Sequence, residues 1–106
     1  MGFLDKLFKP AWQHKDSNVR LYAVKKLNNP KKLALVAKKD SDYKLRIATI
    51  NNPYFKDEEL LNYILEHDGY HVLKKKYLNG MHNTYSYHIF PVRDAASRKL
   101  KELRNK

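Results

Sequence analysis

The 106-residue sequence contains no cysteine, which excludes disulfide bonds, thiolate metal ligands and cysteine nucleophiles. It contains only three glycines, which argues against a glycine-rich backbone loop that would cradle a phosphate. No apolar run approaches the roughly 18–20 residues that a membrane-spanning helix needs. Residues 1–9 also lack the long apolar stretch of a signal peptide. We therefore expect a cytoplasmic protein without integral membrane association.

Motifs that mark common active sites are missing as well. The chain has no H-E-x-x-H pair of metal ligands and no serine nucleophile motif. His67 and His71 are four residues apart, but an Asp-Gly pair between them should end a helix. His82 and His88 are six apart, which is no regular ligand spacing. We predict that the protein is not an enzyme, and we expect no metal, cofactor or small-molecule substrate.

Acidic residues are scarce, because 11 Asp and Glu oppose 22 Lys and Arg, for a formal net charge of +11. Residues 16–39 carry seven basic residues and one acidic residue, a sum of +6, whereas residues 40–67 carry three and six, a sum of −3. A field of this size attracts polyanions. Nine lysines are the candidate partner- or phosphate-binding residues: Lys25, Lys26, Lys31, Lys32, Lys38, Lys39, Lys74, Lys75 and Lys76.

Short sequence marks recur along the chain. The pattern V-R-x-x-A-x-x-K-L occurs at 19–27 and again at 92–100, and Asn-Asn-Pro occurs at 28–30 and at 51–53. An Asp-Ser pair, at 16–17 and at 40–41, can cap the free N–H groups at the start of a helix, and Asn-Pro can end one. These marks predict one domain with three repeat units between two capping segments: 1–15, 16–39, 40–67, 68–90 and 91–106.

The spacing of apolar residues between these marks is that of helices with one buried face. Asp57 is the predicted N-cap of one of them, followed by two glutamates that suit its positive end. The segment 81–90 alternates like a strand, but an isolated strand would have no partner, so we favour a helix or an irregular turn there. The predicted helices lie near 3–9, 17–28, 31–39, 41–51, 57–67, 70–79 and 92–104.

The pattern D-x-x-V-R-x-x-A-x-x-x-L, followed by a short loop with proline and a second apolar helix, resembles bacterial HEAT-like repeats. The Asn-Pro punctuation is similar to that of the leucine-rich repeat variant family. The resemblance covers residues 16–104, although 72–78 lack the Arg and the Ala of the pattern. It implies an all-α fold, a short right-handed α–α superhelix or HEAT-like solenoid of about three and a half units. It also implies a binding role, without specifying a partner.

Three basic residues come shortly after the predicted caps: Arg20, Lys44 and Arg93. We predict that they pair with cap aspartates of neighbouring units and form a structural ladder. The leading functional hypothesis is a non-catalytic binding or scaffold module that presents a rigid helical face to a protein partner with an acidic patch. The alternative is sequence-independent binding of DNA or RNA through the basic face, with the eight tyrosines available for stacking. The 17 lysines against five arginines weigh against that alternative. The sequence leaves the oligomeric state open.

Overall fold

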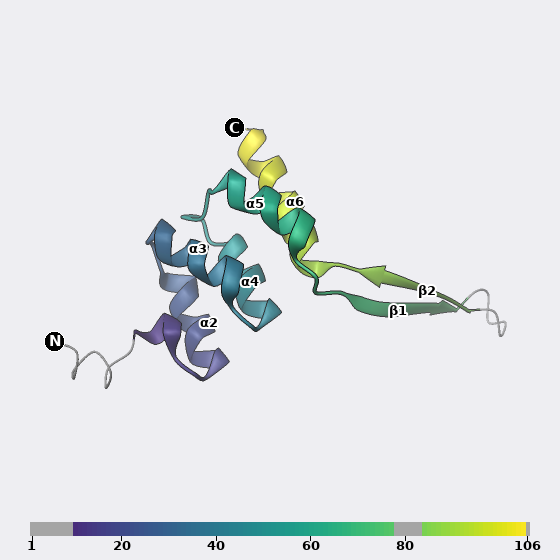
Figure 1. Cartoon of the computed structure of the whole chain (residues 1–106), viewed down its shortest axis with the longest axis horizontal. Helices are drawn as coiled ribbons and strands as arrows, with labels where there is room; N and C mark the ends of the chain where they lie inside the picture. Colours follow the sequence, from purple (N-terminus) through teal and green to yellow (C-terminus); the bar gives the residue numbers. More distant parts are fainter. Residues whose placement is uncertain (1–9, 78–83, 106) are drawn as a thin grey trace.

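The computed structural model describes residues 10–77 and 84–105, which form a mostly helical protein with one small sheet (Figure 1). The predicted helix at 3–9 lies outside these residues. None of the helices in the described part has the length and apolar character needed to cross a membrane. The elements in chain order are η1 (Ala11–Gln13, a 3-10 turn), α2 (Ser17–Lys26), α3 (Pro30–Lys39), α4 (Tyr43–Ile50), α5 (Glu58–His67), β1 (Val72–Tyr77), β2 (Thr84–Ile89) and α6 (Pro91–Arg104).

The helices begin where short polar side chains cap them. The carboxylate of Asp16 accepts a hydrogen bond from the amide of Asn18, and that of Asp57 accepts one from Leu60, so both predicted caps are confirmed. The N-cap of α4 is Asp42, however, and not Asp40. Five of the predicted helices, those at α2, α3, α4, α5 and α6, begin and end within two residues of their expected bounds.

The first Asn-Asn-Pro mark begins a helix instead of ending one. The side chain of Asn29 accepts hydrogen bonds from the amides of Lys31 and Lys32, and Pro30 occupies the first helical position. Proline is well suited to that position because its missing N–H would have no partner there. Helix α2 has already ended at Lys26.

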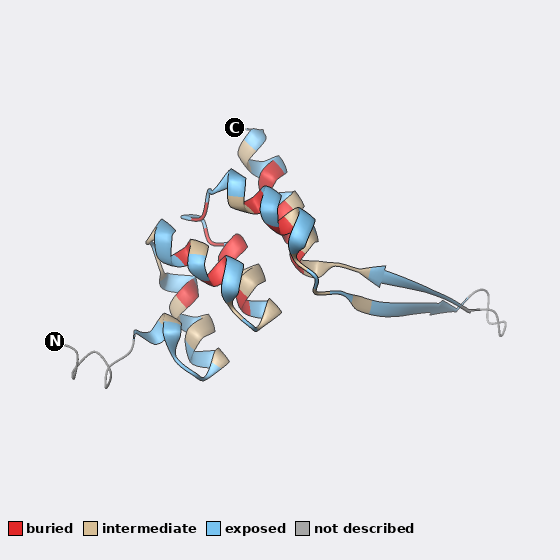
Figure 2. Ribbon diagram, in the orientation of Figure 1, coloured by how far each residue is buried: buried red, intermediate tan, exposed pale blue. Residues whose placement is uncertain are grey.

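The core forms where the apolar stripes of the helices meet (Figure 2). Helix α3 packs against α4 and contributes a stripe of Leu33, Val36 and Ala37, all of them buried. Helix α6 packs against both α4 and α5, and its Leu100 is buried. Val19, in contrast, is exposed, although its spacing predicts a place on the core face of α2. The helices thus form one continuous core that runs from α2 to α6.

Residues 72–89 correct the all-α prediction. β1 pairs with β2 in an antiparallel hairpin, with Val72 opposite Ile89 and Tyr77 opposite Thr84. The helix predicted near 70–79 is therefore wrong, and so is the helix or turn favoured for 81–90 over its described residues. At the sequence level the second strand is rejected because it would have no partner. Its partner is β1, in the segment for which the repeat pattern predicts a helix.

The hairpin projects away from the helices, beyond the ends of α5 and α6 (Figure 1). Its base is anchored by Val72 and Ile89, which are half-buried. The side chains of 73–77 and 85–88 are all exposed, and Figure 2 shows this part of the hairpin in the colour of exposed residues. Pairing satisfies the backbone groups that the two strands turn toward each other, but almost none of the side chains contribute to the core.

Candidate binding surfaces

A guanidinium group links α2 to the segment between α3 and α4. Nε and Nη2 of Arg20 donate hydrogen bonds to the two carboxylate oxygens of Asp40 at 3.0 and 3.2 Å. Nη1 of the same side chain donates to the backbone carbonyls of His14 and Lys15 at 2.9 and 3.0 Å. The forked shape of arginine allows this arrangement, because its donors point in several fixed directions.

The same arrangement recurs between α4 and the end of α5. Nε and Nη2 of Arg46 donate to the carboxylate of Asp68 at 2.8 and 3.3 Å, and Nη1 donates to the carbonyl of Asp40 at 2.7 Å. Nε of Arg93 then donates to the carbonyl of Asp68 at 2.7 Å. Arg20 and Arg46 each reach a carbonyl six residues earlier in the chain. A continuous hydrogen-bonded ladder therefore runs from the loop before α2 to helix α6.

The ladder bears out one sequence prediction in part and corrects two. Arg20 pairs with an aspartate beyond α3, as predicted, but that aspartate, Asp40, is not the N-cap of α4. Lys44 does not belong to the ladder, since it is exposed and Arg46 occupies that place. Arg93 contacts the backbone of Asp68 and not its carboxylate. The side chains of the two ion pairs are only 6–14% exposed, so these groups support the structure and are not offered to a partner.

Asn52 forms a second internal link that the sequence did not reveal. Its buried amide donates to the carbonyls of Val24 and Leu27 at 2.9 and 2.8 Å, and so satisfies the end of α2. Its Oδ1 accepts from the amide of Tyr54 at 2.8 Å, and its carbonyl accepts from Nζ of Lys99 at 3.1 Å. One asparagine thus ties α2, the loop after α4 and α6 together.

All nine candidate lysines are exposed, but the structure does not gather them into one site. None of the nine forms an ion pair with a carboxylate in the described residues. Lys25 borders a hollow with Lys44, and Lys31 borders a different one with Lys56. Lys38 and Lys39 lie at the end of α3, and Lys74–Lys76 lie on the hairpin.

We define the α2–α3 corner as Lys25, Lys26, Lys31 and Lys32, which end one helix and begin the next. Lys25 and Lys26 lie in the last turn of α2, where the negative end of the helix dipole favours cations. Lys31 and Lys32 lie in the first turn of α3, which contains no acidic residue. Cations at that positive end disfavour the helix, so helix stability does not explain this pair.

The eight tyrosines fall into two groups. Tyr43 and Tyr70 are half-buried and stack on one another, with ring centroids 3.9 Å apart. The neighbouring Tyr43 hydroxyl raises the pKa of Tyr70 above its usual value, and partial burial adds to the effect. The six others are exposed: Tyr22, Tyr54, Tyr63, Tyr77, Tyr85 and Tyr87.

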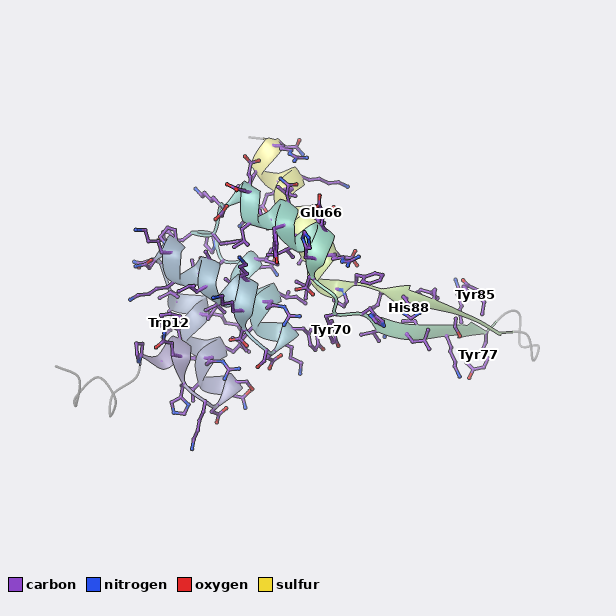
Figure 3. All side chains as sticks on the ribbon, in the orientation of Figure 1. Trp12, Glu66, Tyr70, Tyr77, Tyr85 and His88 are labelled. Atoms are coloured by element: carbon purple, nitrogen blue, oxygen red, sulfur yellow. The ribbon has the colours of Figure 1, made fainter. Side chains whose placement is uncertain are left out.

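Charge and aromatic surface coincide on the hairpin (Figure 3). Lys74 lies opposite Tyr87 and Lys76 lies opposite Tyr85 in the register of the strands. No acidic residue occurs between 69 and 93, so the whole hairpin lacks carboxylates of its own. The sequence did indicate Lys74–Lys76 as candidates, but their tyrosine neighbours became visible only once the strands were paired.

The histidines do not form a metal site among the residues described. Helix α5 ends at His67, so His67 and His71 are not on one helix face. The ring of His71 packs edge-on against that of His88, at 4.8 Å. His82 lies outside the described residues. No group of three His, Cys, Asp or Glu that could hold a metal ion occurs in the part of the chain described.

Comparison with known proteins adds no assignment: no protein-family model, curated protein or solved structure matches this chain.

Proposed function

We propose that this protein is a non-catalytic binding module, built as a short HEAT-like solenoid, that presents exposed lysines to a protein partner with an acidic patch. The repetition of the arginine ladder supports the solenoid, because Arg20 and Arg46 make equivalent contacts in successive units. Shared contacts between neighbouring units are what stabilise repeat proteins. A frame held in this way keeps its surface side chains in place before binding, which reduces the entropy lost on association.

The observation that carries the proposal is the α2–α3 corner. Its four lysines are exposed, and none pairs with a described carboxylate. Lys31 and Lys32 lie at the positive end of α3, where the first turn has no acidic side chain. An acidic patch would supply the negative charge that this helix end lacks, so binding and helix electrostatics favour the same partner.

The test is a titration with a fluorescein-labelled deca-glutamate peptide at low and near-physiological salt. Reversing all four corner lysines to Glu should weaken binding by about tenfold or more, since close charge pairs dominate such an interface. The control variant reverses four exposed cations elsewhere: Lys15, Arg98, Lys101 and Arg104. It should weaken peptide binding by less than about threefold, because salt screens charges that lie far from the bound peptide. Equal losses in the two variants would show that net charge, and not the corner, binds the peptide.

Nucleic-acid binding is a second candidate function, and one observation favours it. The hairpin carries lysines and exposed tyrosines directly opposite one another, which is the combination that single-stranded nucleic acids require of a binding surface. This surface is separate in the chain from the α2–α3 corner, so the two candidates are tested by different substitutions.

A further inference from the structure

We propose that one face of the hairpin binds single-stranded nucleic acid, with Tyr85 and Tyr87 stacking on two successive bases and Lys74 and Lys76 contacting the backbone phosphates. This inference rests on the second candidate function. It does not depend on an acidic protein binding the α2–α3 corner.

The register places these four side chains on the same face. Residues that lie directly opposite in an antiparallel pair share a face, and the side chains along one strand alternate between faces. Lys74 is opposite Tyr87 and Lys76 is opposite Tyr85. We call these four residues the Lys–Tyr face. The other face carries Lys75 opposite Ser86 and Leu73 opposite His88.

The spacing of the two tyrosines suits an extended strand of nucleic acid. Their ring centroids are 5.9 Å apart, and the rings are tilted by 38°. Bases in a duplex are stacked about 3.4 Å apart per strand, so a single strand extended to roughly twice that spacing offers them about 7 Å apart. Alternate residues of a β-strand repeat at nearly the same distance, about 6.8 Å. Two unstacked neighbouring bases can therefore meet two tyrosine rings in turn.

The two rings on this face contact each other, but no described cation covers either of them, unlike the rings of two other exposed tyrosines. Nζ of Lys26 lies 4.3 Å from the ring centre of Tyr22. Tyr63 has Lys38 at 5.0 Å and also stacks on His67. No described cation lies over the ring of Tyr85 or of Tyr87, and these side chains are 44% and 42% exposed. A base can stack here without first displacing a lysine.

A purely structural explanation accounts for part of the Lys–Tyr face only. Lysines on an exposed strand guard against pairing with another sheet edge, which would explain Lys74 and Lys76. It would not explain two exposed tyrosines beside them, since each exposes an aromatic ring without adding to the core. An acidic peptide that adds to the sheet edge would likewise use the lysines but would not need the rings. Stacking and phosphate contact together use all four side chains.

The experiment is a fluorescence anisotropy titration of the full chain with labelled dT12, with the matching duplex and the deca-glutamate peptide as competing probes. The double variant Tyr85→Ala/Tyr87→Ala should weaken dT12 binding by about 30-fold, since each stacked base contributes about 1 kcal/mol or more. The variant Tyr85→Phe/Tyr87→Phe keeps both rings and should bind within about threefold of the wild type. The matched control Tyr22→Ala/Tyr54→Ala removes two exposed tyrosines from the helical part and should leave binding unchanged.

The lysines have a separate readout in the salt dependence. On a single strand, each phosphate that a lysine neutralises adds about 0.7 to the slope of log K against log salt, so Lys74→Gln/Lys76→Gln should reduce the slope by about 1.4. Lys25→Gln/Lys26→Gln, at the α2–α3 corner, should leave the slope unchanged. Because these substitutions leave the tyrosines intact, this measurement does not depend on whether the alanine variant keeps its hairpin.

Three outcomes would overturn the inference. One is dT12 binding that survives both hairpin variants but disappears on reversing the corner lysines, which would place nucleic acid on the helices. Another is absence of dT12 binding near physiological salt, whether or not the deca-glutamate peptide binds the hairpin. A third is equal weakening in the Phe and Ala variants. Failure of the peptide to bind the corner would refute the proposed protein partner and leave the dT12 result intact.

Discussion

The helices and the hairpin differ in where their stabilising contacts lie. The helices bury a shared apolar core and also satisfy polar groups internally, through Asn52 and the arginine ladder. The hairpin is held by its own backbone pairing and by two half-buried residues at its base, Val72 and Ile89. Two-stranded hairpins are marginally stable by themselves. Side chains that add little to the fold are exposed along the hairpin, which leaves their chemistry available to a partner.

The largest contrast should come from removing the same apolar side chain in each region. Leu33→Ala should cost about 2–5 kcal/mol of unfolding free energy, because Leu33 is completely buried and leaves a cavity. Leu73→Ala on the hairpin should cost less than about 0.5 kcal/mol, since Leu73 is 53% exposed. Urea unfolding followed by far-UV circular dichroism measures both. Similar losses would mean that the hairpin belongs to the cooperative core.

Breaking the arginine ladder should cause the next largest loss of unfolding free energy. Arg46→Ala should cost about 3 kcal/mol, because it leaves the sheltered carboxylate of Asp68 without its cation. Lys44→Ala, two residues earlier on an exposed position, should change stability by less than about 0.5 kcal/mol. The same urea titration compares the two variants, and equal effects would remove the ladder as a source of stability.

The asparagine link should have a smaller effect than the ladder. Asn52→Ala should cost about 2 kcal/mol, since the carbonyls of Val24 and Leu27 lose a buried donor. The neighbouring Asn51→Ala is the matched control, because Asn51 is exposed and its change should be within about 0.5 kcal/mol. Thermal unfolding of the two variants at one pH measures the difference. A neutral Asn52 variant would contradict the assigned bridge.

The smallest predicted change in unfolding free energy is a gain in stability and not a loss. Lys31→Glu/Lys32→Glu should raise stability by about 0.3–1 kcal/mol, because acidic residues favour the first turn of α3. Lys25→Glu/Lys26→Glu should lower it by a similar amount, since cations suit the last turn of α2. Both should weaken binding of the deca-glutamate peptide. Urea unfolding at low salt gives the sign, and a destabilised Lys31/Lys32 variant would remove the argument that these lysines serve a partner.

The candidate site was predictable in part. Arg20 could be assigned to the ladder from its place after a cap, but the second arginine could not be chosen correctly. The sequence suggested Lys44, whereas the side chain must reach both the carboxylate of Asp68 and a carbonyl six residues back, and Arg46 does so. Asn52 was also missed, because the same Asn-Asn-Pro letters cap a helix at Asn29 and bridge buried carbonyls at Asn52.

Local signals in the amino-acid sequence were sufficient to predict five helices and the presence of one buried face on each. Caps such as Asp16 and Asp57 act over three residues, and an apolar stripe repeats within a single helix, so neither depends on distant parts of the chain. The strand at 72–77 could be recognised only in the folded protein, because a strand is stabilised by a partner segment and not by its own letters. That pairing also brought lysines and tyrosines to one face, where we place the binding of nucleic acid.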